Sequence, residues 1–177
     1  MGEPAAHASQ PATGRDCGTC TLCCKVYDVP VLDKPAGTWC RHCRPGRGCG
    51  IHDTRPDYCR SFHCLWMTQG WLGPEWKPER CKMVLSVDPA TNFLFVNVDP
   101  GAPAAWKAQP FHGQLRQWAT AGAAQRRHVV VFLGKNATVI LPDRDVPLGT
   151  VGPGDRIVAR ERRTATGLTF DVEKVAA

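Results

Sequence analysis

All ten cysteines of this chain lie between Cys17 and Cys81, and the long remainder after Cys81 has none. The same stretch is poor in periodic apolar residues, so it cannot bury a large core and needs cross-links or bound metal to fold. The first sixteen residues lack the apolar run of a secretory signal, which predicts a cytoplasmic protein. Because disulfides do not persist in a reducing cytosol, we expect the cysteines to bind metal rather than to pair as disulfides.

Composition divides the chain into three parts. Residues 1–15 are predicted to be a disordered tail, residues 16–82 a cysteine-cluster metal-binding module, and residues 83–177 a compact β-rich domain with one amphipathic helix. The predicted fold class is therefore α+β, with a small metal-stapled module of short helices and loops placed before the β-rich domain.

Alternating apolar residues predict the elements of the C-terminal domain. A helix is expected over residues 113–124, because Leu115, Trp118 and Ala119 have the spacing of an apolar helical stripe. Six strands are expected, two of them in a hairpin around the polar residues 88–92, and a charged stretch at 160–163 is expected to separate the last two. The expected strands are 83–87, 93–98, 128–133, 137–141, 155–159 and 168–172.

The module opens with the motif C-x-x-C-x-x-C-C at residues 17–24. If the motif is helical, with Asp16 as N-cap, then Cys17, Cys20 and Cys24 share one face and Cys23 serves a neighbouring site or packs. If it is instead a turn followed by an extended stretch, Cys23 and Cys24 point apart. Both readings predict two metal sites or one polynuclear site.

A second group follows at Cys40, Cys43 and Cys49, among glycines that let the backbone turn tightly around a ligand sphere. A helix is then expected from Thr54, its N-cap, to Gly70.

That helix would carry Cys59 and Cys64. Because they are five residues apart, they point in different directions and should reach different ligand positions or different metals. We expect His42, His52 and His63 to lie at the surface or behind the ligands. Cys81 is either a late ligand or a buried thiol.

Nine cysteines are therefore predicted to form the metal site: Cys17, Cys20, Cys23, Cys24, Cys40, Cys43, Cys49, Cys59 and Cys64. Six of them are expected to contact the metal directly, namely Cys17, Cys20, Cys24, Cys49, Cys59 and Cys64. We assign no catalytic residue, because the sequence shows no nucleophile triad, acid–base pair, phosphate loop or dinucleotide fingerprint.

The module resembles the YkgJ-type cysteine-cluster proteins, a family with a C-x-x-C-x-x-C-C signature that is described as zinc- or iron-chelating. The resemblance runs through Cys17 to Cys24, Trp39-Cys40-x-x-Cys43 and the stretch from Gly48 to Trp66. His52 departs from the family, which often has tyrosine there. The resemblance implies metal binding; some members are described as iron–sulfur oxidoreductases, and the flagellin lysine methylases look like a distant branch.

Zinc and an iron–sulfur cluster both suit these thiols. The paired C-x-x-C units favour structural zinc, while the opening Cys17, Cys20, Cys23 triplet is similar to the first ligands of a bacterial ferredoxin. The first functional hypothesis is a metal-binding module, folded by its metal, that presents a C-terminal interaction domain to a protein partner. The alternative is an iron–sulfur protein with redox or protein-modifying activity.

A third hypothesis, an RNA-binding zinc protein, comes from the formal net charge of +6. That balance counts every thiol as neutral, whereas metal ligands are thiolates, so metal binding lowers it. The arginines of the module are better explained as offsetting the thiolates, and neither nucleic acid nor a membrane is an expected partner. No apolar run approaches the length that a membrane-spanning helix needs.

Overall fold

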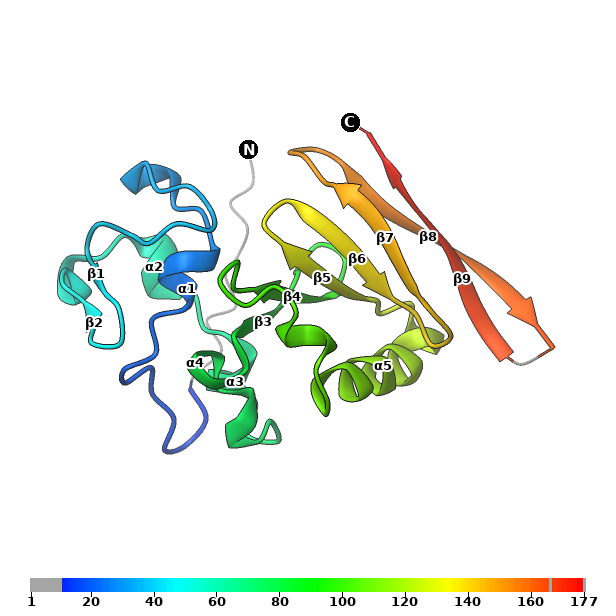
Figure 1. The fold of residues 1–177 in the computed structure, drawn as a ribbon, viewed down its shortest axis with the longest axis horizontal. Coiled ribbons are helices and arrows are strands. Elements are labelled where there is room, and N and C mark those ends of the chain that lie inside the picture. The colour runs from blue at the N-terminus through cyan, green and yellow to red at the C-terminus, as the bar shows by residue number, and fades with distance from the viewer. Residues whose placement is uncertain (1–10, 166, 177) are drawn as a thin grey trace. The chain divides into compact units, whose positions relative to one another are not determined.

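The computed structural model describes residues 11–165 and 167–176. The chain forms two compact units, Met1–Ser86 and Val87–Ala177. Its fold is α+β, with short helices and several small sheets (Figure 1). None of the helices in the described residues combines the length and the hydropathy that crossing a membrane requires.

The first unit is built from very short elements. Its α-helices have four or five residues, and none of them has a side-chain cap bond. They are α1 (Cys23–Val26), α2 (Asp57–Ser61), α3 (Leu65–Thr68) and α4 (Pro78–Cys81). The 3-10 turns are η1 (Pro30–Leu32), η2 (His52–Thr54) and η3 (Pro74–Trp76), and the strands are β1 (Cys43–Arg44) and β2 (Gly48–Cys49). A third strand, β3 (Met83–Val87), runs across the boundary of the units.

A small apolar cluster anchors the first unit. It consists of Leu22, Val26, Cys64, Met67 and Val84, with the aromatic rings of neighbouring residues packed against it. These residues come from both ends of the cysteine-rich stretch, so the cluster holds α1 and α3 beside the start of β3.

Two residues of the predicted tail are attached to the first unit. The Ala12 amide donates to the Met67 carbonyl at 2.8 Å, and the Arg15 guanidinium donates to backbone carbonyls at the end of α3 and lies over the Trp66 ring. Residues 1–10 of that predicted tail lie outside the described residues.

The second unit contains longer strands and one full helix. Its helical elements are η4 (Ala105–Lys107), α5 (Phe111–Gly122) and η5 (Ala123–Gln125). Its strands are β4 (Leu94–Val98), β5 (Val129–Leu133), β6 (Asn136–Ile140), β7 (Asp145–Thr150), β8 (Arg156–Thr164) and β9 (Gly167–Val175). In the sheet β4-β5-β6-β7, β4 and β5 are parallel and the other pairs are antiparallel.

Helix α5 joins the two parallel strands and lies along the sheet (Figure 1). Its predicted apolar stripe is present, since Leu115 and Ala119 are buried and Trp118 is half-buried. The helix starts and ends two residues earlier than predicted, because the last two predicted residues form the 3-10 turn η5.

The core of the second unit lies between the sheet and its neighbours. The fully or nearly buried residues are Phe93, Ala123, Val130, Ala137, Val139, Leu141 and Phe170. Phe170 comes from β9, so the β8–β9 hairpin contributes to this core.

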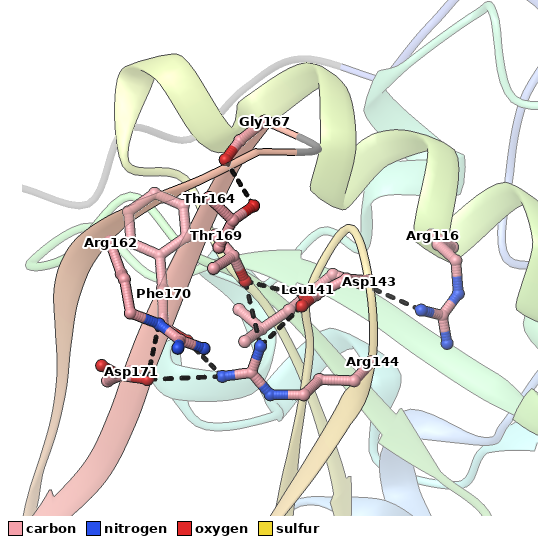
Figure 2. A network of polar contacts seen from close by, with 10 residues as sticks. All are labelled: Arg116, Leu141, Asp143, Arg144, Arg162, Thr164, Gly167, Thr169, Phe170 and Asp171. Carbon is pink, nitrogen blue, oxygen red and sulfur yellow. Dashed lines mark hydrogen bonds and ion pairs between the residues drawn. The ribbon is translucent and has the colours of Figure 1, made fainter.

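A polar network also holds the hairpin in place (Figure 2). Arg144, in the turn between β6 and β7, donates to the hydroxyl of Thr169 at 3.0 Å and to the carbonyl of Phe170 at 2.7 Å. The Thr169 hydroxyl in turn donates to Asp143 at 2.8 Å. The turn is therefore bonded directly to β9.

Two strand predictions needed correction. Strand β7 was not predicted, because Pro147 and Gly149 are unfavourable in strands; it forms at the sheet edge, where β6 has an irregular register at Ala137/Thr138. Residues 160–163 were predicted as a connection but belong to β8. Ion pairs across the hairpin, such as Arg160 with Glu173 and Arg162 with Asp171, accompany the longer pairing.

Candidate metal centre

The opening motif is a turn followed by a short helix, which matches neither of the predicted alternatives in full. The Cys20 amide donates to the Cys17 carbonyl at 2.7 Å, and the intervening Gly18 has a positive φ of 48° that favours glycine. Helix α1 then begins at Cys23, after Leu22 as N-cap, so Asp16 is not the cap that the helical reading required. Cys17 and Cys20 thus lie on the turn, and Cys23 and Cys24 on the helix.

The second group of cysteines is tied to this helix by backbone bonds. The Cys40 amide donates to the Cys24 carbonyl at 3.0 Å. Strands β1 and β2 pair so that Cys43 lies opposite Cys49, and Gly48 adopts a φ of 110° that allows the tight return. The glycine-rich loop therefore returns Cys49 to the side of Cys43.

The predicted helix from Thr54 to Gly70 is interrupted. Helix α2 begins after Pro56, not after a Thr54 cap, and the chain is extended at Phe62 and at Cys64 before α3 starts. The break separates Cys59, on α2, from Cys64, which precedes α3. The two cysteines line different cavities, and their assignment to different ligand positions, which assumed an unbroken helix, stays a prediction.

Two cavities lie among these elements. Cavity A has a volume of about 110 Å³ and is lined by Cys17, Cys23, Cys24, Cys40, Cys43, Cys49, Cys59 and His63, with Arg55 and several apolar residues. Cavity B has a volume of about 40 Å³ and is lined by Cys17, Cys20, Cys23, His63 and Cys64, with Trp66 and apolar residues. Cys17, Cys23, Phe62 and His63 line both cavities, so the two share a wall.

The nine cysteines predicted as the metal site are the nine that line these two cavities. Cys81 lies elsewhere, buried, with its thiol bonded to the carbonyls of Trp76 and Met83. All ten cysteines are free thiols.

The thiols of cavity A disfavour one another's ionisation. A hydrogen bond with Cys23, and then burial, raises the pKa of Cys24 far above its ordinary value. Burial, followed by the charge of Cys24, raises the pKa of Cys43 to about 12. Burial and the charges of Cys24, Cys40 and Cys49 raise the pKa of Cys59. These shifts favour the neutral form of Cys24, Cys43 and Cys59, and a cation among them would reverse that preference.

The thiols of cavity B form a second interacting group. Burial, together with the charges of Cys20 and Cys17, raises the pKa of Cys64 to about 11. Burial, followed by the charge of Cys20, raises the pKa of Cys17. The charged neighbours of Cys64 include Cys20 and Cys17 of cavity B, and the thiol neighbours of Cys43 and Cys59 line cavity A. Cys17 interacts with Cys20 of cavity B and also with Arg55 and Cys24 of cavity A.

Three buried nitrogens without a hydrogen-bond partner lie on the walls of the same two cavities. Within the described residues, they are the only buried side-chain nitrogens or oxygens in this state: Arg55 Nε on cavity A, Trp66 Nε1 on cavity B and His63 Nδ1 on both. A buried, unpaired polar atom costs free energy, so its occurrence indicates an interaction with an ion or water. His63 thus lies on the walls of both cavities, whereas the sequence led us to expect it at the surface or behind the ligands.

Lys34 is a further residue that sequence reasoning missed. Its side chain is buried, and its ammonium donates to the carbonyls of Lys25, at 2.8 Å, and Tyr27 at the end of α1. Burial lowers the pKa of Lys34, and the charges of Cys24 and Cys40 oppose that shift. A buried cation beside the thiols favours their thiolate form, but no pattern in the sequence distinguishes this lysine from an exposed one.

The other two histidines of the module do not line either cavity. The His52 side chain is 63% exposed and pairs with Asp53 at 3.4 Å. His42 contributes its carbonyl to the β1–β2 loop, where it accepts from the Gly50 amide.

The donor chemistry suits zinc or an iron–sulfur centre, since both take cysteine thiolates and imidazole. As the side chains stand in the described part of the chain, no three of His, Cys, Asp or Glu converge closely enough to hold a metal ion. No protein-family model, curated protein or solved structure matches this chain.

Proposed function

We propose that residues 16–82 form a metal-binding module whose cysteine thiolates hold zinc or iron, and whose fold depends on that metal. The observation that carries the proposal is that nine of the ten cysteines line two adjoining cavities while the tenth packs elsewhere. The thiols come from segments that lie far apart in the sequence: the opening turn, α1, the β1–β2 hairpin, α2 and the residue before α3.

The electrostatics of the cavities support the proposal. Neutral thiols that are for the most part only half-buried contribute little packing, whereas thiolates around a cation form strong bonds and remove the mutual repulsion. Arg55 and Lys34 provide positive charge at the same place: Arg55 lowers the pKa of Cys17 and Cys59, and Lys34 lowers that of Cys24, in each case against larger opposing effects. The resemblance to the YkgJ-type proteins agrees with this function, and membership of that family stays a prediction.

The second unit contains no cysteine and is proposed as the interaction domain. It has a pocket of about 360 Å³ whose walls come from η4 and from strands β5 and β6, including Trp106, Lys107 and Leu133. An apolar pocket with a cation at its rim suits a protein segment that carries an apolar side chain and an acidic group. The proposed location of the protein is the cytoplasm, where thiols stay reduced.

An iron–sulfur protein with redox or protein-modifying activity is the alternative, and one observation favours it. Cavity A, at about 110 Å³, is larger than cavity B, and its seven cysteines include more than the four thiolates that a two-iron or four-iron cluster takes. Anaerobically purified protein with broad visible absorption and stoichiometric iron would select this alternative, and colourless protein with zinc would select the first.

The proposal is tested by elemental analysis of freshly purified protein and of single Cys→Ser variants. Cys59→Ser should lower metal content and solubility, because it removes a thiol of cavity A. Cys81→Ser is the matched control, since its serine hydroxyl can still donate to the carbonyls of Trp76 and Met83. Full and equal metal loading of the Cys59→Ser protein would refute the assignment.

A further inference from the structure

We propose that cavity B is a separate mononuclear site with four donors, in which His63 Nδ1 completes the set formed by Cys17, Cys20 and Cys64. Cavity A then holds its own all-thiolate centre. The inference rests on the proposed metal-binding function and goes beyond it, because it assigns a histidine ligand and divides the cysteines between two sites.

The first argument is the position of His63. Its Nδ1 atom is buried and has no hydrogen-bond partner, and the residue lines the wall between the cavities. Neutral imidazole nitrogen is a good zinc ligand, and a buried nitrogen with neither partner nor metal costs free energy. His63 lies in the break between α2 and α3, where the backbone on either side of it is extended.

The second argument is the division of the thiols. Cys20 and Cys64 line cavity B alone, and five cysteines line cavity A alone. Cys17 lines both, and the hydrogen bond from the Cys20 amide to the Cys17 carbonyl holds it in one turn with Cys20, which assigns it to cavity B. Cys23 also lines both and lies beside Cys24 in helix α1, which assigns it to cavity A.

The third argument is volume. Cavity B, at about 40 Å³, is the smaller of the two cavities. Cavity A, at about 110 Å³, is almost three times as large. One ion therefore suits cavity B, where three cysteines and one histidine form a donor set known from structural zinc sites. Trp66 Nε1, unpaired on the same wall, can donate to a thiolate of this site.

The experiment uses full-length protein, loaded anaerobically with Zn²⁺ or with Co²⁺ as a spectroscopic probe. His63→Ala should lose about one metal ion per chain and keep the rest. His63→Cys should keep the full count but shift the Co²⁺ absorption, because a sulfur replaces a nitrogen in the ligand set. His52→Ala is the matched control and should change neither quantity, since that imidazole is exposed.

The outcomes separate this inference from the proposed function. If wild-type protein takes up no metal, both fail. If wild-type protein binds metal but His63→Ala keeps the full count and an unchanged Co²⁺ spectrum, only the present inference fails. Loss of all metal from both His63 variants would also overturn it, because the two sites would not be separate. In a second variant, Cys43→Ser, the centre in cavity A should be lost while the Co²⁺ signal that depends on His63 remains.

Discussion

The cysteine-rich loops of the first unit and the central strands of the second unit differ sharply in how much apolar surface they bury. Residues 35–63 carry Cys40, Cys43, Cys49 and Cys59, and no residue among them is buried. In strand β5 of the second unit, by contrast, Val129, Val130 and Val131 are each at most 2% exposed. Burial of apolar surface orders the second stretch. The first stretch contains no fully buried residue, and under the proposed function the bonds between its thiolates and the metal order it.

Within the first unit, too, one part is held by buried apolar residues and another part is not. Its apolar cluster around Leu22, Met67 and Val84 contains buried residues, and Arg15 bonds to backbone carbonyls nearby. This base can keep some structure without metal. The comparison therefore predicts where the dependence on metal begins and ends along the chain.

The largest expected effect is that of removing the metal. Chelation under reducing conditions should abolish hydrogen-exchange protection across residues 35–63, because nothing else in that segment offsets the conformational entropy of ordering it. Strands β5 and β6 should keep their protection, since their core contains no thiol. Hydrogen exchange followed by mass spectrometry gives both results in one experiment. Native-like protection around Cys59 in metal-free protein would show that packing holds the segment.

The converse change acts on the second unit. Leu115 of α5 is fully buried against the sheet, so Leu115→Ala should lower the free energy of unfolding of that unit by about 2–5 kcal/mol. Metal content should not change, because the core of the second unit contains no cysteine. Denaturant unfolding and elemental analysis of the same preparation measure both. A loss of metal in this variant would show that the two units are not independent in stability.

Periodicity was informative where apolar burial decides the structure. The runs at 128–133 and 137–141 predicted β5 and β6 to within a residue, and the Leu115 and Ala119 stripe predicted α5. It failed where local preference was overruled. Pro147 and Gly149 are poor strand residues, yet β7 forms because β6 offers a partner edge.

In the first unit, the residue types were more informative than the pattern. The nine cysteines could be selected from spacing alone, and they do surround the two cavities. Their division between cavities depends on the extended backbone from Phe62 to Cys64, which no capping or breaking residue announces. For the same reason the placement of His63 and the burial of Lys34 were not predictable from the sequence.

An effect of pH distinguishes the core of the second unit from its surface. His128 is buried between the rings of Phe93 and Phe170, and burial lowers its pKa. The unfolded chain therefore binds a proton near pH 6.5 that the folded unit resists. Stability should be full above that value and should fall as the pH drops toward the folded pKa, by at most about 1.4 kcal/mol per pH unit.

The measurement is denaturant unfolding at pH 7 and pH 5.5, followed through methyl signals of β5 and β6. His128→Phe should remove this part of the pH dependence, because the replacement ring does not ionise. His52→Ala should retain it, since His52 is exposed in the other unit. An identical pH dependence in the His128→Phe protein would assign the acid sensitivity to other groups.

The smallest effect is expected on the outer face of the β8–β9 hairpin. Arg160 and Glu173 form an ion pair at 2.6 Å, but their side chains are 70% and 50% exposed. Solvent screens such a pair, so Arg160→Ala should change the free energy of unfolding by less than about 1 kcal/mol. Arg144 carries the same charge in a different setting. It donates to the Phe170 carbonyl and to the buried Thr169 (Figure 2).

Arg144→Ala leaves those acceptors without their donor, which costs about 1–3 kcal/mol when the group is buried. Denaturant unfolding of both variants, monitored on the second unit, compares the two arginines directly. An Arg160→Ala effect as large as that of Arg144→Ala would mean that exposed charge pairs stabilise the hairpin. A larger effect of Arg144→Ala would show that, within the second unit too, a polar residue contributes where it satisfies buried groups. The proposed metal dependence of the first unit rests on the same criterion.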